Sequence, residues 1–86
     1  MVNNMRVNDL KKRVRSILRK LSVKIDDNIM DSTSLTKECG LDSIGLMEFM
    51  LLIEEEFAIE FDERFELKYL ESIDSIINYL LEFEEC

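Results

Sequence analysis

The stretch from Asp42 to Phe57, DSIGLMEFMLLIEEEF, decides the fold, because it opens with a helix cap and continues as one amphipathic helix. Asp42 is a good N-cap residue, and its negative charge suits the positive end of the helix dipole. With Ser43 at zero and about 100° per residue, one apolar stripe spans about 240° to 340°. We expect this stripe to pack on the core. Its members are Leu46, Phe49, Met50, Ile53 and Phe57.

The same helix carries a second apolar stripe. Ile44, Met47 and Leu51 fall between about 40° and 100°, on a side that also carries glutamates. A central helix buried on all sides by its neighbours is one explanation, but Glu48 and Glu55 argue against burial there. We therefore predict a surface that docks a basic partner, in which the apolar residues provide affinity and the acids provide steering.

Upstream of this helix, an apolar residue recurs every three or four positions over about residues 4–22, which predicts a first helix with Asn3 or Asn4 as its cap. Residues 23–41 lose that pattern and are rich in Asp, Ser, Thr and Asn, so we expect a long loop held to the core by a few apolar side chains. Loops of this length in compact domains are usually functional. The apolar stripe of the first helix consists of Val7, Leu10, Val14, Ile17, Leu18 and Leu21.

Downstream, a shorter element is expected near residues 63–70, and Ser72 has the character of a cap for a last helix. The chain of 86 residues suits one domain over residues 1–86. We predict an all-α fold, a four-helix bundle with three longer helices, one short helix and a long loop between the first two. The core face of the last helix consists of Ile73, Ile76, Ile77 and Leu80.

Composition argues against several function classes. The chain has no His, which removes the usual general base near neutral pH and the commonest metal ligand, so we expect neither an enzyme nor a metal site. The longest apolar run, residues 49–53, is far shorter than the roughly 20 residues of a membrane span, and the N-terminus lacks the apolar region of a secretory signal. Cys39 and Cys86 are expected to be free thiols in a reducing cytoplasm.

The charge is divided unevenly along the chain. Residues 1–24 contain eight bases and one acid, whereas residues 25–86 contain three bases and 18 acids. A basic segment can indicate nucleic-acid binding, or it can be the solvated face of an amphipathic helix beside an acidic body. We favour the second, because the net charge of −8 repels phosphate backbones. Lys12, Arg15 and Arg19 are then expected on the side away from the core, and the acidic body indicates a positively charged protein partner.

Ser43 is the residue that could carry chemistry. It begins a helix directly after the long loop, so we expect an exposed hydroxyl whose phosphate ester would be favoured by free backbone N–H groups and the helix dipole. With no base nearby it is not a self-activated nucleophile. It is either a passive acceptor that another enzyme modifies or an ordinary polar residue of the first turn. The residues alone leave both possibilities open.

The segment around this serine resembles acyl carrier proteins. Residues 40–44, GLDSI, are similar to their Gly-x-Asp-Ser-[Leu/Ile] signature, residues 53–57, IEEEF, are similar to their helix end, and the resemblance extends over about residues 5–83. It implies that Ser43 carries 4′-phosphopantetheine through a phosphodiester. The terminal thiol of that arm holds acyl or aminoacyl groups as thioesters. A phosphopantetheinyl transferase would attach the arm from coenzyme A with Mg²⁺, and Asp42 would help position the serine for it.

The resemblance also implies which residues meet partner enzymes. Ile44, Met47, Glu48 and Leu51 match positions where family members contact their enzymes, and these lie in the second stripe together with Glu55. We therefore predict a non-catalytic, monomeric carrier that binds the transferase and the enzymes that load and condense its cargo, with neither nucleic acid nor membrane as a partner. The alternative is an unmodified acidic helical interaction module.

Three departures from the family's fatty-acid-synthesis members refine this prediction. Gly45 stands where those carriers commonly have an acidic residue, Cys39 where Leu is usual, and Asp62 where Pro is frequent. The first helix is also unusually basic. Together these features favour a stand-alone carrier of a specialised pathway, whether its cargo is acyl, polyketide or aminoacyl.

Overall fold

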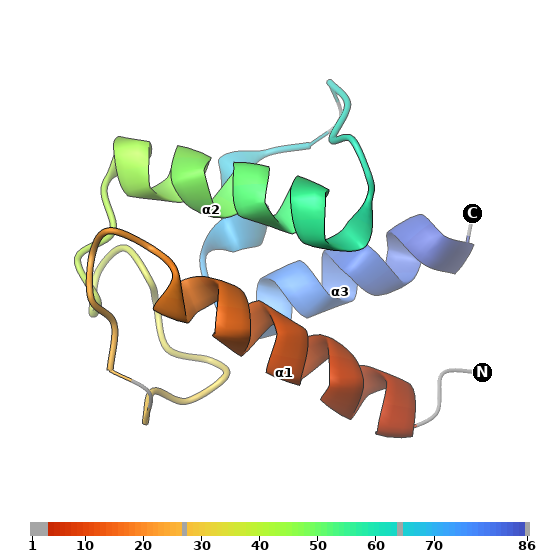
Figure 1. Cartoon of the computed structure of the whole chain (residues 1–86), viewed down its shortest axis with the longest axis horizontal. Helices are drawn as coiled ribbons and strands as arrows, with labels where there is room; N and C mark the ends of the chain where they lie inside the picture. The colour runs from red at the N-terminus through yellow and green to blue at the C-terminus, as the bar shows by residue number, and fades with distance from the viewer. Residues whose placement is uncertain (1–3, 27, 64, 86) are drawn as a thin grey trace.

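The order of the elements follows the hydrophobic periodicity closely. In the computed structural model, which describes residues 4–26, 28–63 and 65–85, the chain forms α1 (Asn4–Arg19), α2 (Ser43–Phe57), the 3₁₀ helix η1 (Leu67–Leu70) and α3 (Ile73–Glu85) (Figure 1). The described residues contain no strand, so the all-α class is confirmed. The short fourth element is a single 3₁₀ turn of four residues rather than a full helix.

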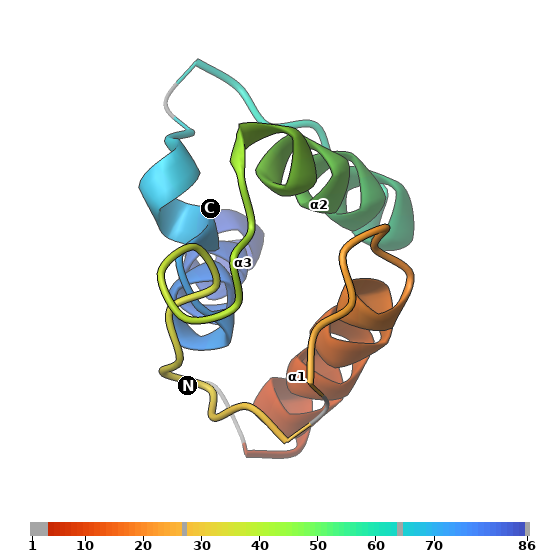
Figure 2. The ribbon, with the colours of Figure 1, turned by 90° about the vertical axis from the view of Figure 1, so that its left-hand side faces the viewer.

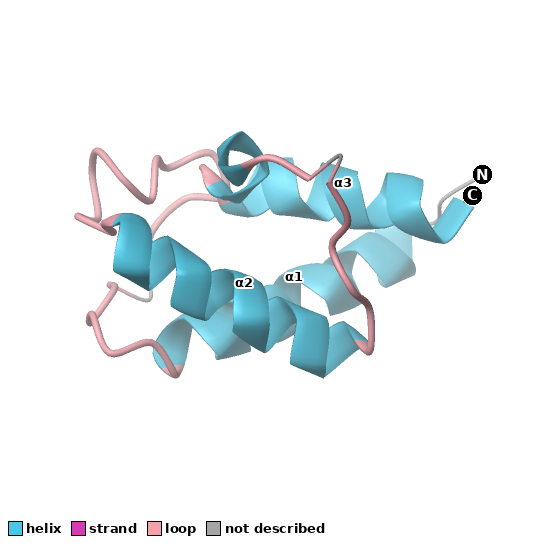
Figure 3. Cartoon of the chain, turned by 90° about the horizontal axis from the view of Figure 1, so that it is seen from above, coloured by secondary structure: helices cyan, strands magenta, loops and turns pink. Residues whose placement is uncertain are grey.

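The three α-helices surround one apolar core. α1 packs against both α2 and α3, and η1 packs against the same two helices. Seen along the bundle, the helices and η1 enclose a common centre (Figure 2), and from above α1 and α2 lie on one side with α3 and η1 on the other (Figure 3). Every helix contributes its predicted inner face. The buried apolar residues are Leu10, Val14, Ile17, Leu18, Leu21, Leu35, Leu41, Leu46, Phe49, Ile53, Leu70, Ile73, Ile76, Ile77 and Leu80.

α1 ends at Arg19, three residues before the predicted end at residue 22. The N–H groups of Lys20 and Leu21 donate to carbonyls only three residues back, at 2.9 and 3.3 Å, so the last turn tightens and the chain leaves the helix axis. Leu21 nevertheless remains buried. The apolar spacing predicted a longer helix because the turn after α1 also places an apolar side chain, Leu21, in the core.

Residues 20–42, here called loop 1, are hydrogen-bonded to the segment where η1 meets α3. The Leu35 N–H donates to the Glu71 carbonyl at 2.7 Å, and the Asp74 N–H donates to the Asp31 carbonyl at 3.0 Å. Leu35 itself is fully buried. Loop 1 is therefore anchored at the junction of η1 and α3, as expected of a loop held to the core.

Only part of the apolar set expected in loop 1 serves as an anchor. Ile25 and Ile29 are half-buried against the core, whereas Val23 and Met30 are exposed. Polar contacts provide the remaining attachment, since the Glu71 carboxylate accepts hydrogen bonds from the Ser34 and Thr36 hydroxyls. These two hydroxyls hold the pKa of Glu71 below its usual value.

Ser72 caps α3, as predicted. The Ser75 N–H donates to the Ser72 hydroxyl oxygen at 3.1 Å, and the Ser72 N–H donates to the Ser75 hydroxyl oxygen at 3.0 Å. This reciprocal pair satisfies two of the N–H groups that a helix start leaves unpaired. The cap of α1 is different: Asn3 lies outside the described residues, and Asn4 is already the first residue of the helix.

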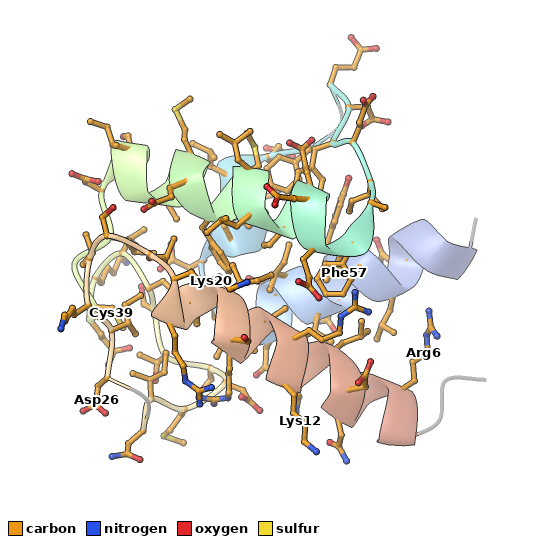
Figure 4. The ribbon with its side chains drawn as sticks, viewed as in Figure 1. Arg6, Lys12, Lys20, Asp26, Cys39 and Phe57 are labelled. Atoms are coloured by element: carbon orange, nitrogen blue, oxygen red, sulfur yellow. The ribbon has the colours of Figure 1, made fainter. Side chains whose placement is uncertain are left out.

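The basic face of α1 is not uniformly solvated: Arg15 lies outside the core, as predicted, but it binds loop 1. Its guanidinium donates to the Asp31 carboxylate at 2.7 Å and to the Ile29 carbonyl at 2.9 Å, and the Lys11 ammonium lies 2.9 Å from the same carboxylate. Because Lys11 and Arg15 favour the ionised form, the pKa of Asp31 lies below its ordinary value. Lys12, by contrast, points away from α2 into solvent (Figure 4).

A second basic side chain joins α1 to the end of α2. The Arg13 guanidinium donates to the Glu56 carboxylate at 3.0 Å and to the Glu56 carbonyl at 2.9 Å. It also lies over the ring of Phe57, 4.2 Å from the centroid. The bases of α1 are thus partly used to fasten the bundle.

Candidate functional site

The start of α2 is built by the motif residues themselves. Gly40 has a φ of 79°, in the left-handed region that favours glycine, and turns the chain into the helix. The Asp42 carboxylate accepts a hydrogen bond from the Gly45 N–H at 2.8 Å, and the Asp42 carbonyl accepts one from the Leu46 N–H at 2.9 Å. The predicted N-cap role of Asp42 is confirmed.

Gly45 has a packing reason that the sequence did not reveal. A Cβ added at this position would lie 2.8 Å from Cδ2 of Leu41, which is shorter than real Cβ contacts allow. Leu41 is itself buried, so loop 1 closes directly over the first turn of α2. The missing side chain lets Leu41 pack there. From sequence, Gly45 was notable only as a departure from an acidic position.

Ser43 lies exposed at the first position of α2, as predicted. Its hydroxyl has no hydrogen-bond partner among the described residues. The Gly45 N–H is bound by the Asp42 carboxylate, and the Leu46 N–H is bound by the Asp42 carbonyl. The N–H groups of Ser43 and Ile44, which come before them, therefore have no partner in the helix. An exposed hydroxyl beside two free N–H groups fits a covalently attached anionic phosphodiester.

The second apolar stripe of α2 is exposed, as predicted. Ile44, Met47 and Leu51 are 77%, 53% and 57% exposed. Together with half-buried Leu52 they line an open groove of about 500 Å³ that begins next to Ser43. The inner stripe behaves differently: Leu46, Phe49 and Ile53 are buried, and Met50 and Phe57 are half-buried against the core.

The carboxylates of α2, of which Glu48 and Glu55 line the groove, are not equivalent. Glu48 is half-buried, and its two oxygens accept hydrogen bonds from the N–H and the hydroxyl of Ser22, at 3.1 and 3.2 Å. Glu54 accepts a hydrogen bond from the Phe61 N–H at 2.7 Å. Glu55 is exposed and makes no ion pair or hydrogen bond with any described residue. The structure therefore separates Glu48 from Glu55, which the sequence had grouped together.

Other possible chemistry receives little support from the structure. Cys39 is a free, half-buried thiol whose pKa is raised by burial and by the charges of Glu38 and Asp26; Cys86 lies outside the described residues. No group of three or more potential metal ligands occurs within residues 4–26, 28–63 and 65–85. Across the same residues, no helix is long and apolar enough to cross a membrane.

Comparison with known proteins identifies the family. The family model described as "Phosphopantetheine attachment site" matches residues 10–80. The chain is 33% identical over 60 residues to the protein named mitochondrial acyl carrier protein of Neurospora crassa, a match that covers 67% of this chain and 44% of that protein. It is also 28% identical over 75 residues to the acyl carrier protein of Buchnera aphidicola, covering 86% and 92% respectively. The chain belongs to the acyl carrier protein family.

Membership confirms the resemblance and what it implies about the cofactor. As a member of this family, the chain is a carrier rather than a catalyst, and its prosthetic group is covalently attached 4′-phosphopantetheine. The match spans less than half the length of the Neurospora relative, but almost all of the Buchnera one. The matched region includes the whole of α2, its cap and the groove.

Proposed function

We propose that Ser43 is the residue to which a phosphopantetheinyl transferase attaches the arm from coenzyme A. The observation that carries this proposal is the exposed, unengaged hydroxyl of Ser43 at the first position of α2, inside the matched region. Once attached, the arm supplies a terminal thiol that holds the cargo as a thioester. The chain contributes a fixed, accessible point of attachment.

The surrounding residues support Ser43 without reacting. Asp42 holds the first turn of α2 through its bond to the Gly45 N–H, so the serine is presented in one orientation. The N–H groups of Ser43 and Ile44, which have no partner in the helix, would favour the negative charge of a phosphodiester on Ser43. In this proposal Asp42 is a positioning residue that keeps Ser43 accessible to the transferase.

The groove of α2 is proposed as the surface that the transferase and the cargo-handling enzymes contact. Ile44, Met47 and Leu51 provide exposed apolar area beside the attachment point, and Glu55 provides an unengaged charge. We propose that the carrier acts as a monomer for a specialised pathway, on acyl, polyketide or aminoacyl cargo. A cytoplasmic setting is supported by the free thiol of Cys39.

The modification is tested by mass spectrometry. The apo protein is incubated with coenzyme A, Mg²⁺ and a broad-specificity phosphopantetheinyl transferase, and should gain the mass of one phosphopantetheine. Ser43→Ala should gain nothing while keeping its helical circular dichroism. Ser16→Ala, which removes an exposed serine of α1, is the matched control and should be modified like the wild type.

The outcome also separates the two functions left open by the residues. Absence of a mass gain with several different transferases would favour an unmodified interaction module, in which the groove alone acts. Modification of Ser43→Ala would place the arm on another residue and contradict the assignment.

A further inference from the structure

The end of loop 1 that leads into Ser43 is held by a residue that is distant in the sequence. Glu71 lies between η1 and α3, and its carboxylate accepts a hydrogen bond from the Ser34 hydroxyl. The Thr36 hydroxyl lies 3.0 and 2.8 Å from the two oxygens of the same carboxylate. The Glu71 carbonyl accepts a hydrogen bond from the Leu35 N–H at 2.7 Å. Glu71 thus binds three consecutive residues of loop 1.

These three residues begin a turn, residues 34–41, that is closed by its own hydrogen bonds. The Glu38 N–H donates to the Ser34 carbonyl at 3.0 Å, and the Glu38 carboxylate accepts a hydrogen bond from the Ser34 N–H at 2.8 Å. The Leu41 N–H donates to the Leu35 carbonyl at 2.9 Å. Leu35 and Leu41 are both buried. A displacement of Leu35 would therefore displace Leu41 as well.

Leu41 connects this turn to the start of α2. Its side chain packs on the first turn of the helix, where a Cβ added at Gly45 would lie 2.8 Å from Leu41 Cδ2. Asp42 follows and caps the helix through the Gly45 N–H, and Ser43 is the next residue. Hydrogen bonds and packing contacts therefore link the junction of η1 and α3 to the attachment serine.

Other carboxylates hold loop 1 at its earlier residues. The Asp31 carboxylate binds two bases of α1, and the Glu48 carboxylate binds Ser22. Asp31 and Ser22 both precede the turn of residues 34–41. Of these three carboxylates, Glu71 holds the part of loop 1 that is nearest to Ser43 in the sequence.

We propose that Glu71 is a positioning residue for Ser43, because its carboxylate holds the turn of residues 34–41 and thereby fixes the start of α2 in the form that a phosphopantetheinyl transferase modifies. This inference rests on the proposed function, since Ser43 must be the attachment point. Without the carboxylate, the turn opens more often. The transferase then finds Ser43 correctly presented in a smaller fraction of the molecules, and the apparent affinity falls with that fraction.

The test measures kcat and KM with the apo protein as the varied substrate of a broad-specificity transferase, in the presence of coenzyme A and Mg²⁺. Glu71→Ala should raise KM about fivefold and change kcat by less than about twofold. Glu71→Gln keeps a side-chain oxygen that accepts hydrogen bonds from hydroxyls, so its KM should stay within about twofold of the wild type. An equal rise of KM in both variants would contradict a hydrogen-bonding role of Glu71.

Two matched controls separate positioning from a general loss of stability. Asp31→Asn removes a carboxylate that holds the earlier part of loop 1, so it should lower the thermal midpoint while KM stays within about twofold of the wild type. Glu60→Ala removes an exposed carboxylate outside loop 1 and should change neither value. A rise of KM in Asp31→Asn as large as that in Glu71→Ala would overturn the inference.

Amide hydrogen exchange followed by NMR provides a measurement that does not depend on activity. In Glu71→Ala, exchange of the Leu41 N–H should accelerate about tenfold more than exchange of the Ile53 N–H inside α2, because the turn opens locally. Equal acceleration at both amides would indicate general unfolding and contradict the inference.

A second variant tests the same contact if Glu71→Ala does not fold. Thr36→Val removes the hydroxyl that binds both carboxylate oxygens of Glu71 and should raise KM about threefold. An unchanged KM in Thr36→Val would overturn the positioning role while leaving Ser43 as the attachment point. Absence of any modification of the wild type would instead contradict the proposed function itself.

Discussion

The outward faces of α1 and α2 differ in which side chains contact the rest of the chain and which are exposed to solvent. On α1, Lys11 and Arg15 converge on Asp31, so two of the bases expected to be solvated are contacts of the fold. On α2, Ile44 and Leu51 are exposed although apolar side chains favour burial. α1 directs charged groups toward the rest of the bundle, whereas α2 directs apolar groups away from it.

This difference indicates which helix is scaffold and which is functional surface. Charged side chains that find partners within the chain contribute to stability and lose their availability to other molecules. Exposed apolar side chains contribute little to stability, and a groove of them next to an exposed serine is typical of an interaction site. Three predictions test this comparison, ordered from the largest expected effect to the smallest.

The largest effect separates the two stripes of α2. Phe49→Ala removes a fully buried ring and should lower the free energy of unfolding by about 3–5 kcal/mol. Leu51→Ala removes an exposed side chain from the same helix and should change it by less than about 0.5 kcal/mol. Urea denaturation followed by circular dichroism measures both. If Leu51→Ala lowered the free energy of unfolding by several kcal/mol, the second apolar stripe would be part of the core.

An intermediate effect is expected where loop 1 covers the first turn of α2. Gly45→Val places a branched side chain against Leu41 and should cost about 1–3 kcal/mol of unfolding free energy. Gly45→Ala should cost less, because the end of the Leu41 side chain can move and Ala gains up to about 1 kcal/mol of helix propensity over Gly. Thermal unfolding compares the two variants. Equal stability of Gly45→Val and the wild type would show that Leu41 does not close over this turn.

The smallest effect concerns the charges of α1. Asp31→Asn should cost about 1–2 kcal/mol at pH 7, because two bases lose a partly exposed carboxylate partner. The pKa of Asp31 is lowered from its reference value of 3.8, so its contribution is complete above that pH and is lost as the pH falls through the lower folded value. Urea denaturation should therefore show Asp31→Asn less stable than the wild type at pH 7. The difference in unfolding free energy should shrink below about pH 3.

Two controls accompany this prediction. Lys12→Gln removes a solvated base of the same helix and should change stability by less than about 0.5 kcal/mol at pH 7. Other carboxylates that titrate in acid, such as Glu71, are present in both proteins and cancel in the difference. A gap between Asp31→Asn and wild type that persists at the lowest pH would contradict an electrostatic origin.

Much of the fold was predictable because residues within or next to each helix indicate where it lies. The caps Asp42 and Ser72 lie at helix starts, and the apolar period of each segment identified the buried face. The end of α1 and the short η1 were placed less well. A 3₁₀ turn has a different hydrogen-bond pattern but can deliver apolar side chains to the same core, so apolar spacing alone does not separate it from an α-helix.

The sequence by itself determined the all-α class, the two stripes of α2, the exposed position of Ser43 and the family, because these depend on residues that are close along the chain. Only the tertiary structure decided how the charges are shared. Glu48 binds Ser22 across 26 positions, and Arg15 binds Asp31 across 16. Two carboxylates on one helix face look alike in sequence, since their difference lies in what loop 1 brings beside them. Folding makes Glu48 part of the framework and leaves Glu55 in solvent.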